Sequence, residues 1–431
     1  MNEYDSRRVI VSLASRGACL TNRLHRADVI FLNTCCVREK AEQKAFSFLG
    51  RLRHLKMRNP AVKIIVAGCL AQQMGDLLLT RFEHVDLVVG TQGFSTVGRL
   101  LDELRHSPVK IAHLPESDPE WDIPCPPSGG TPECPVSASV TIMQGCDNFC
   151  TYCIVPYVRG REKSRPSRLI LEEIQGLVDS GTREVVLLGQ NVNSYGRGLD
   201  EQTDFAQLLR RIHAIPGLLR IRFTTSHPKD LTDALIRSLA QLPKLAKHLH
   251  LPFQAGSDKV LERMGRGYTA GEYLEKIQNL REACPDIALS ADVMVGFPGE
   301  TDEDFQATLR LMETVRFDTL FSFRYSDRPG TKSSQFPGKV DEDVKAKRLR
   351  ELQAVQELIT LEKQRAEQGK VREVLVEGPS KAASNGQMSG RTMQNRIVNF
   401  QGSAGLRGKT VHVRIVSAFS HSLRGELLPS Q

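Results

Sequence analysis

The sequence contains no long apolar run. Its longest apolar stretches, around residues 64–67 and 185–188, are far shorter than the roughly 20 apolar residues that a bilayer-spanning helix needs. The first ten residues, MNEYDSRRVI, are polar and charged, so the apolar segment of a secretory signal is missing there. We therefore expect a cytoplasmic protein without membrane association.

The chain also lacks an excess of acidic residues, with 58 Lys and Arg against 50 Asp and Glu and a net charge of +8. This balance favours an anionic partner, nucleic acid first, although a basic enzyme of another kind is equally compatible with charge alone. The ten cysteines are not expected to form a disulfide framework in a cytoplasmic protein. Clustered cysteines therefore predict metal or redox use.

The 431 residues suit two or three domains, and residues 1–113 have the pattern of an α/β domain. Short buried strands are expected at 29–32 and 63–67, each followed by a cysteine-bearing turn and a helical segment. This alternation predicts a parallel sheet with outer helices, and ligands of such sheets lie at the carboxyl ends of the strands. Residues 114–135 are rich in Pro, Gly and Ser and are predicted to form a linker.

Residues 136–338 repeat the strand–helix alternation. Strands are expected at 139–143, 184–188, 220–224, 248–251, 290–295 and 319–324. Such a series predicts a complete or partial TIM-like (β/α) barrel. Residues 339–370 show helical spacing and predict a connecting helix, and residues 371–431 alternate strand-like runs with Gly-rich turns, which predicts a small β-barrel.

A cysteine motif directly follows the first expected barrel strand. Cys146, Cys150 and Cys153 are spaced as C-x3-C-x2-C, at the functional end of such a barrel. Soft thiolates suit iron–sulfur clusters, and three cysteine ligands leave one iron of a cubane free for a substrate. A zinc site with a distant fourth ligand is the alternative.

The motif in this position resembles the signature of the radical S-adenosylmethionine (SAM) superfamily. The longer string GCDNFCTYCIVPYVRGREKSRP at 145–166 is similar to its methylthiotransferase family. The resemblance extends along nearly the whole chain through LLGQNVNSY at 187–195, RFTTSHP at 222–228, HLPFQAGS at 250–257, VGFPGET at 295–301 and YSDRPGT at 325–331.

The resemblance implies a 4Fe–4S cluster on the three cysteines, which binds SAM and passes it one electron. The resulting 5′-deoxyadenosyl radical would remove a hydrogen atom from an unreactive carbon. It also implies that Tyr152 covers one side of the cluster. The residues expected to contact SAM are Gln190, Gln254, Gly296 and Gly299. For each of these, a structural turn or a core hydrogen bond is the alternative.

The resemblance further implies a second 4Fe–4S cluster in the N-terminal domain, held by three cysteines. Cys35 in NTCCVREKA and Cys69 in GCLAQ match two of them, whereas the third belongs to a Gly-Cys-Gln-Met-Asn string of which only the end is present. The native start could lie upstream, or the second cluster could have been lost. A substitute ligand is the third explanation, although Cys36 should diverge from its neighbour and Cys19 matches a variable stretch.

Two basic regions are expected to contact RNA phosphates. The first, with Arg159, Arg161, Lys163, Arg165 and Arg168, follows the cysteine loop, and a solvated charged loop is its alternative. The second is the C-terminal region 371–431, which has eight Lys or Arg against three Glu and resembles the RNA-binding TRAM domain. Arg391, Arg396 and Lys409 are its predicted RNA contacts. Aromatic residues are few there, so phosphate contacts should outweigh base stacking.

Within the family, the strings at 2–6, 33–41 and 389–396 look most like the branch that acts on tRNA. That branch adds a methylthio group to carbon 2 of isopentenyl-adenosine next to the anticodon, using one SAM to methylate sulfur and another to form the radical. The expected partners are tRNA and a reductant such as flavodoxin or ferredoxin, and the expected state is a monomer. Methylthiotransferases of threonylcarbamoyl-adenosine or of a ribosomal protein, a single-cluster radical SAM enzyme, and a non-catalytic tRNA-binding module are the alternatives.

Overall fold

The computed structural model describes residues 1–36, 39–106, 109–117, 134–380 and 386–429. The predicted linker therefore lies largely outside the described residues. The chain forms two compact units. The first consists of Met1–Cys134, Ser139–Phe149 and Cys153–Ser180, and the second of Pro135–Ala138, Cys150–Tyr152 and Gly181–Gln431. Among the described residues, no helix combines the length and the apolar character needed to cross a bilayer.

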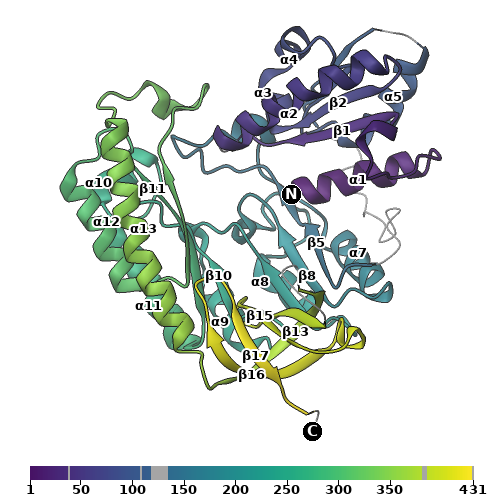
Figure 1. Ribbon diagram of the computed structural model, residues 1–431. Helices are drawn as coiled ribbons and strands as arrows, with labels where there is room; N and C mark the ends of the chain where they lie inside the picture. The colour runs from purple at the N-terminus through teal and green to yellow at the C-terminus, as the bar shows by residue number, and fades with distance from the viewer. Residues whose placement is uncertain (37–38, 107–108, 118–133, 381–385, 430–431) are drawn as a thin grey trace. The chain divides into compact units, whose positions relative to one another are not determined.

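The first unit is built on a four-stranded parallel sheet of order β1-β2-β3-β4 (Figure 1). Its strands are β1 (Val29–Thr34), β2 (Lys63–Gly68), β3 (Leu87–Val89) and β4 (Ile111–His113). The sequence predicts the first two strands and the parallel sheet correctly. It misses β3 and β4 because strands of three residues leave almost no periodic pattern.

Helices cover both faces of this sheet, because successive residues of β2 point to opposite sides. Ile65 packs in the apolar cluster that includes Val9 and Leu100, whereas Ile64 packs in the one that includes Leu49. The helices are α1 (Asn2–Ala14), α2 (Glu39–Arg58), α3 (Cys69–Met74), α4 (Asp76–Arg81) and α5 (Val97–His106). Further elements of this unit are β6 (Met143–Gln144), α6 (Val155–Arg159), β7 (Lys163–Ser164) and α7 (Ser167–Asp179).

The second unit contains the expected β/α alternation, with β5 (Ser137–Thr141) divided between the units. Its other strands in this region are β8 (Glu184–Leu188), β9 (Arg220–Phe223), β10 (His248–His250), β11 (Ala288–Val295) and β12 (Thr319–Arg324). β8 pairs with β9, and β10-β11-β12 form a second sheet, all in parallel. A parallel bridge links Ile221 of β9 to Leu245, three residues before β10, and the arrangement is a partial barrel.

The helices between these strands begin where the sequence supplies N-caps. They are α8 (Phe205–His213), α9 (Asp233–Gln241), α10 (Asp258–Met264), α11 (Ala270–Ala283) and α12 (Asp302–Val315). Thr269 and Thr301 form capping boxes with the residues three positions on, which satisfy backbone donors at the starts of α11 and α12. These caps determine the residues at which α11 and α12 begin.

The C-terminal part of the second unit is the helix α13 (Glu342–Arg365) followed by a closed β-barrel. The barrel has the order β13-β14-β15-β17-β16 (Figure 1). Its strands are β13 (Val371–Pro379), β14 (Gln387–Thr392), β15 (Ile397–Gln401), β16 (Thr410–Ala418) and β17 (Leu423–Leu427). Alternate residues such as Val374 and Val376 fill its core, which is the pattern that predicts a small barrel.

Candidate functional site

The cysteines of the first unit lie at the carboxyl ends of adjacent strands. Cys35 and Cys36 follow β1, Cys69 follows β2, and Thr34 is in register with Gly68. Gly68 has φ +97°, and a Cβ there would lie 2.5 Å from the carbonyl oxygen of Thr34. Only glycine allows this approach, which places the start of α3 beside the end of β1.

A buried arginine contacts Cys69. Arg159, at the end of α6, is 3% exposed, and its Nε donates to the sulfur of Cys69 at 3.4 Å. Its Nη2 pairs with the carboxylate of Asp5 at 2.9 Å. A hydrogen bond from Cys36 and the charge of Arg159 lower the pKa of Cys69 to about 6, and the same bond raises the pKa of Cys36. These two effects favour the thiolate form of Cys69, which is the form that binds metals.

The donor chemistry of this site fits an iron–sulfur group, because soft thiolates are its preferred ligands. Across the described ranges, no three His, Cys, Asp or Glu side chains are arranged to hold a metal ion. The ligand roles of Cys35 and Cys69 stay predictions.

The second unit holds Cys150 beside another buried arginine. Arg266 is 5% exposed, and its Nη1 donates to the Cys150 sulfur at 3.4 Å and to the Tyr152 hydroxyl at 3.5 Å. Its Nη2 donates to the carbonyl of Pro252 at 3.0 Å, and its Nε to the hydroxyl of Tyr268 at 3.2 Å. The two cysteines Cys69 and Cys150 thus each accept an N–H from a buried guanidinium at the same distance.

Arg266 is not among the residues that the sequence predicts for this site. The available signal is its position between Gly265 and Gly267, both with positive φ, directly after α10. The same segment holds the cysteine loop, because the N–H of Thr151 donates to the carbonyl of Met264 at 2.9 Å. Cys146 and Cys153 belong to the first unit, where the N–H of Cys146 donates to Gly160 at 3.3 Å. The joint ligand role of the three cysteines stays a prediction.

Predicted SAM contacts follow the carboxyl ends of three parallel strands of the second unit. Gln190 follows β8, Gln254 follows β10, and Gly296 follows β11. Gln254 has φ +67°, a costly conformation for a side chain of this kind, and it bridges to Val293 of β11. The sequence therefore places these residues at one end of the strands, as the barrel rule requires.

A buried carboxylate shapes the turn between Gly296 and Gly299. Glu300 accepts the N–H of Gly296 at 2.6 Å and Nη1 of Arg348, on α13, at 2.8 Å. Burial raises the pKa of Glu300 to about 7 against the opposing effect of these two donors. A Cβ on Gly296 would lie 2.3 Å from the side chain of Lys345, so α13 packs directly on this turn.

Two of the predicted phosphate contacts after the cysteine loop are buried ion-pair partners. Arg159 is held by Asp5, as described above, and Arg165 is fully buried and pairs with Glu173 at 2.9 Å. Neither guanidinium is accessible to a phosphate, which corrects the prediction for these two residues. Arg161 and Lys163 are exposed, and Arg161 pairs with Asp147 at 2.7 Å.

The C-terminal basic residues differ in the same way. The side chain of Arg396 is 11% exposed and pairs with Asp318 at 2.5 Å, so it faces protein and the predicted RNA contact is corrected. Arg391 is 27% exposed and pairs with Glu377 at 3.0 Å, whereas Lys409 is exposed. Of the three predicted RNA contacts in this region, Lys409 is the one that offers its charge to solvent.

Three family models match the chain in the order of its parts. The "Uncharacterized protein family UPF0004" matches residues 1–90, the "Radical SAM superfamily" residues 140–312 and the "TRAM domain" residues 365–428. The parallel-sheet domain, the partial barrel with its cysteine loop and the closed β-barrel thus define a radical SAM protein with an attached TRAM domain. Membership of this superfamily implies a 4Fe–4S cluster and SAM.

Full-length relatives narrow this class. A tRNA-2-methylthio-N(6)-dimethylallyladenosine synthase of Syntrophobacter fumaroxidans is 62% identical over 429 residues, covering 99% of this chain and 93% of the relative. A relative with the same name from Syntrophus aciditrophicus is 51% identical, covering 99% of this chain and 92% of the relative. The chain belongs to the family of tRNA-2-methylthio-N(6)-dimethylallyladenosine synthases.

A solved structure supports the fold alone. The radical SAM methyltransferase TsrM from Kitasatospora setae, with cobalamin and a 4Fe–4S cluster bound, matches with a TM-score of 0.56 at 15% identity. The match covers 77% of this chain and 74% of that one.

Proposed function

We propose that this protein transfers a methylthio group to carbon 2 of dimethylallyl-adenosine in tRNA, with SAM and two 4Fe–4S clusters as cofactors. The observation that carries the proposal is the 62% identity to a synthase of this name along 99% of the chain. Identity of this extent spans the cysteine-bearing domain, the radical SAM domain and the TRAM domain together, so the parts for both chemistry and RNA binding are present.

Cys146, Cys150 and Cys153 would hold the SAM-binding cluster, and Cys35 and Cys69 would be ligands of the second. When bound, the first cluster supplies the electron that splits SAM and the second supplies sulfur. The chain contributes a fixed N–H donor to one sulfur at each site. Donors to ligand sulfurs fix their orientation and favour the charged thiolate.

The SAM pocket would be formed by the loops that carry Gln190, Gln254, Gly296 and Gly299. Glu300 keeps the Gly296 turn in place by accepting its N–H, and Arg348 holds Glu300 from α13. This support keeps a glycine-bearing turn open for close approach of a ligand to the backbone.

Exposed cations of the TRAM domain would bind the tRNA backbone. Arg414 on β16 and Arg424 on β17 are exposed, and the guanidinium of Arg424 lies 5.7 Å from the ring centre of the exposed Phe419. Lys409 precedes β16 and is also exposed. These residues supply phosphate contacts and one aromatic face, the combination typical of single-stranded RNA binding. A reductant such as flavodoxin or ferredoxin would supply the electrons.

The test is a reconstitution under anaerobic conditions followed by mass analysis of nucleosides from tRNA that carries the dimethylallyl group. We expect about eight irons per chain and methylthio product from the wild type. Cys150→Ala should lower the iron to about four per chain and abolish the product. Cys19→Ala, a change at an exposed cysteine, should alter neither.

Two results would overturn the proposal. A wild type that holds about four irons and cleaves SAM but leaves the tRNA mass unchanged would be a single-cluster radical SAM enzyme. A protein that binds tRNA without retaining iron would be an RNA-binding module.

A further inference from the structure

The TRAM barrel contacts the amino-terminal ends of the radical SAM strands. Arg220 is the first residue of β9, and Asp318 directly precedes β12. Both contact residues of the TRAM barrel, as described below. The predicted SAM contacts follow the opposite ends of strands in the same parallel sheets. The contacts with the TRAM barrel and the predicted SAM contacts therefore lie at opposite ends of the partial barrel.

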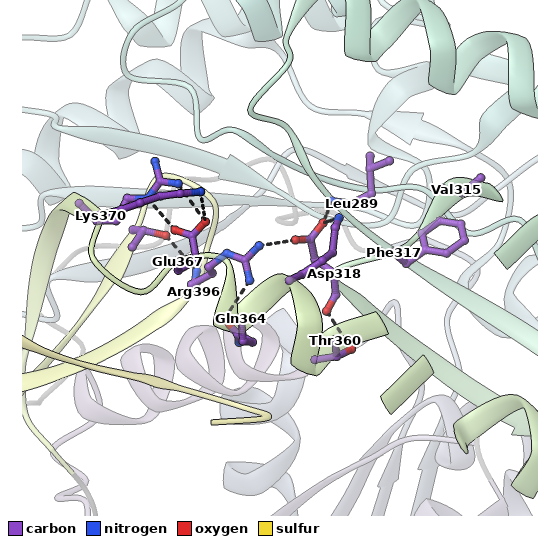
Figure 2. Close-up of polar contacts among 12 residues, drawn as sticks. Leu289, Val315, Phe317, Asp318, Thr360, Gln364, Glu367, Lys370 and Arg396 are labelled. Carbon is purple, nitrogen blue, oxygen red and sulfur yellow. Dashed lines mark hydrogen bonds and ion pairs between the residues drawn. The ribbon is translucent and has the colours of Figure 1, made fainter. Parts of the chain in front are cut away.

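Asp318 is the centre of one contact, which Figure 2 shows. Its Oδ1 accepts from Nη2 of Arg396 at 2.5 Å, and its Oδ2 accepts from Nζ of Lys363 at 2.7 Å and from the N–H of Leu289 at 2.9 Å. Its side chain is 9% exposed. One buried carboxylate thus joins the start of β12, the end of α13 and the TRAM barrel.

The end of α13 strengthens the same contact (Figure 2). Gln364 accepts from Nη1 of Arg396 at 2.9 Å, so both terminal nitrogens of this arginine are bound. Two residues beyond the helix end, Glu367 accepts two hydrogen bonds from Arg372 of β13, at 2.6 and 2.9 Å. These bonds tie the first barrel strand to the helix that precedes it.

A second contact holds the hairpin between β14 and β15. Arg220 is 2% exposed, and its Nη1 donates to the carbonyls of Arg391 at 2.7 Å and Thr392 at 3.2 Å. Nη1 of Arg222 donates to Oδ1 of Asn395 at 2.6 Å, and Asn395 has φ +64°. The hairpin that contains two predicted RNA contacts is thus bound by the radical SAM strands.

We propose that Asp318 is a positioning residue that holds the TRAM barrel on the radical SAM strands and so presents bound tRNA to the reaction. Its ion pair with Arg396 is called the latch below. This inference rests on the proposed function. Asp318 balances two cations, Arg396 and Lys363, in an environment where an unpaired charge is costly. Loss of its charge should free the barrel to move.

The latch lies far from the predicted SAM contacts. β11 has eight residues and separates Leu289, near its start, from Gly296 just beyond its end. At about 3.3 Å per residue this is a distance of about 23 Å, so the latch cannot contact SAM. Its loss should therefore weaken the use of tRNA while leaving SAM cleavage intact.

The test compares Asp318→Asn and Arg396→Gln with the control Glu362→Gln. Glu362 lies on α13, as Lys363 does, and the control removes only its exposed ion pair with Arg316. For the two latch variants we expect uncoupled formation of 5′-deoxyadenosine within about twofold of wild type and a KM for tRNA raised about tenfold, with little change in kcat. The double variant should match the single ones, because both break the same pair. Glu362→Gln should behave as wild type.

Hydrogen exchange gives a readout that does not depend on methylthio transfer. Amides of β14 and β15 should exchange faster in the latch variants than in wild type or Glu362→Gln. Arg396→Lys keeps the positive charge and should restore part of the protection that Arg396→Gln loses. This comparison does not depend on whether Asp318→Asn folds.

Faster exchange with an unchanged KM for tRNA would overturn the inference, and so would a fall in SAM cleavage parallel to the loss of product. If wild type itself yields no product, the proposed function fails. The role of Asp318 is then tested by the dissociation constant for tRNA alone. An unchanged dissociation constant in Asp318→Asn would overturn it, and a raised one would support it.

Discussion

The buried pair of Arg165 and Glu173 in the first unit gives a quantitative test of how its helices are held. Both side chains are fully buried, their charged atoms are 2.9 Å apart, and Glu173 also accepts from the hydroxyl of Tyr4 on α1 at 3.1 Å. Arg165 further donates to the carbonyl of Thr141 at 2.7 Å. The perturbation is Glu173→Gln, which keeps the size of the side chain and removes its charge.

The expected cost is large because it leaves a guanidinium buried without a counter-charge. Breaking one partner of such a pair costs about 3–5 kcal/mol. The neighbouring Glu172→Gln is the matched control, since Glu172 forms an exposed pair with Arg168 and such pairs contribute about 0–1 kcal/mol. The double change Arg165→Met with Glu173→Leu should recover most of the loss, because it removes both buried charges.

The assay is hydrogen exchange of the α7 amides, which measures the local free energy of opening. A loss of 3 kcal/mol corresponds to exchange more than about 100 times faster. Equal exchange in Glu173→Gln and Glu172→Gln would refute the reasoning, because it would mean that the buried guanidinium finds water or another partner without cost.

Three further predictions concern the cysteine sites and the turn between Gly296 and Gly299. In the metal-free protein, thiolate absorbance at 240 nm should reveal a cysteine that titrates near pH 6, and Arg159→Gln should move this titration of Cys69 to higher pH. Because the pKa of Glu300 is raised to about 7 from an ordinary 4.5, the folded state holds a proton that the unfolded state releases. Stability should therefore fall as pH rises from about 4.5 to 7, and Glu300→Gln should flatten this dependence in thermal melts. Gly145→Ala should destabilise the cysteine loop and lower its iron content, since φ is +77° and a Cβ would lie 2.0 Å from the Arg161 carbonyl oxygen. The control Gly50→Ala on α2 has open space, and gains up to about 1 kcal/mol in helix propensity.

Most of the strands that sequence reasoning predicts are at least four residues long and contain several apolar side chains. β8 and β12 lie where they are expected, because runs such as Glu184–Leu188 leave little choice of structure. β14 and β17 are missed, since Gln-Met-Ser-Gly-Arg-Thr and Leu-Arg-Gly-Glu-Leu bury only alternate positions and contain glycine. Their pairing is determined by the closed barrel, a tertiary property that local sequence does not carry.

The cysteines of the candidate sites are recognisable from spacing, whereas the charged residues around them are not. Arg159, Arg165 and Arg396 look like solvent-facing cations in sequence, yet each has a buried carboxylate partner. For Arg159 and Arg396 that partner is distant along the chain. The glycines on either side of Arg266 mark a turn but do not indicate that its guanidinium contacts Cys150. Burial of an arginine depends on which carboxylates, carbonyls and hydroxyls the fold brings to it, so composition alone assigns the wrong role.

Helix α13 contacts both ends of the partial barrel. Arg348, in its first half, binds Glu300 beneath the glycine turn, and Lys363, near its end, binds Asp318 at the TRAM contact. Fifteen residues of α-helix separate the two contacts, which corresponds to about 22 Å. The length of the helix therefore sets the spacing between the glycine turn and the TRAM barrel. One added residue would lengthen it by only about 1.5 Å but rotate one contact by about 100° relative to the other. Both contacts can therefore be kept only if α13 gains or loses nearly a whole turn. The distance between the TRAM barrel and the glycine turn can thus change only in steps of about one helical turn.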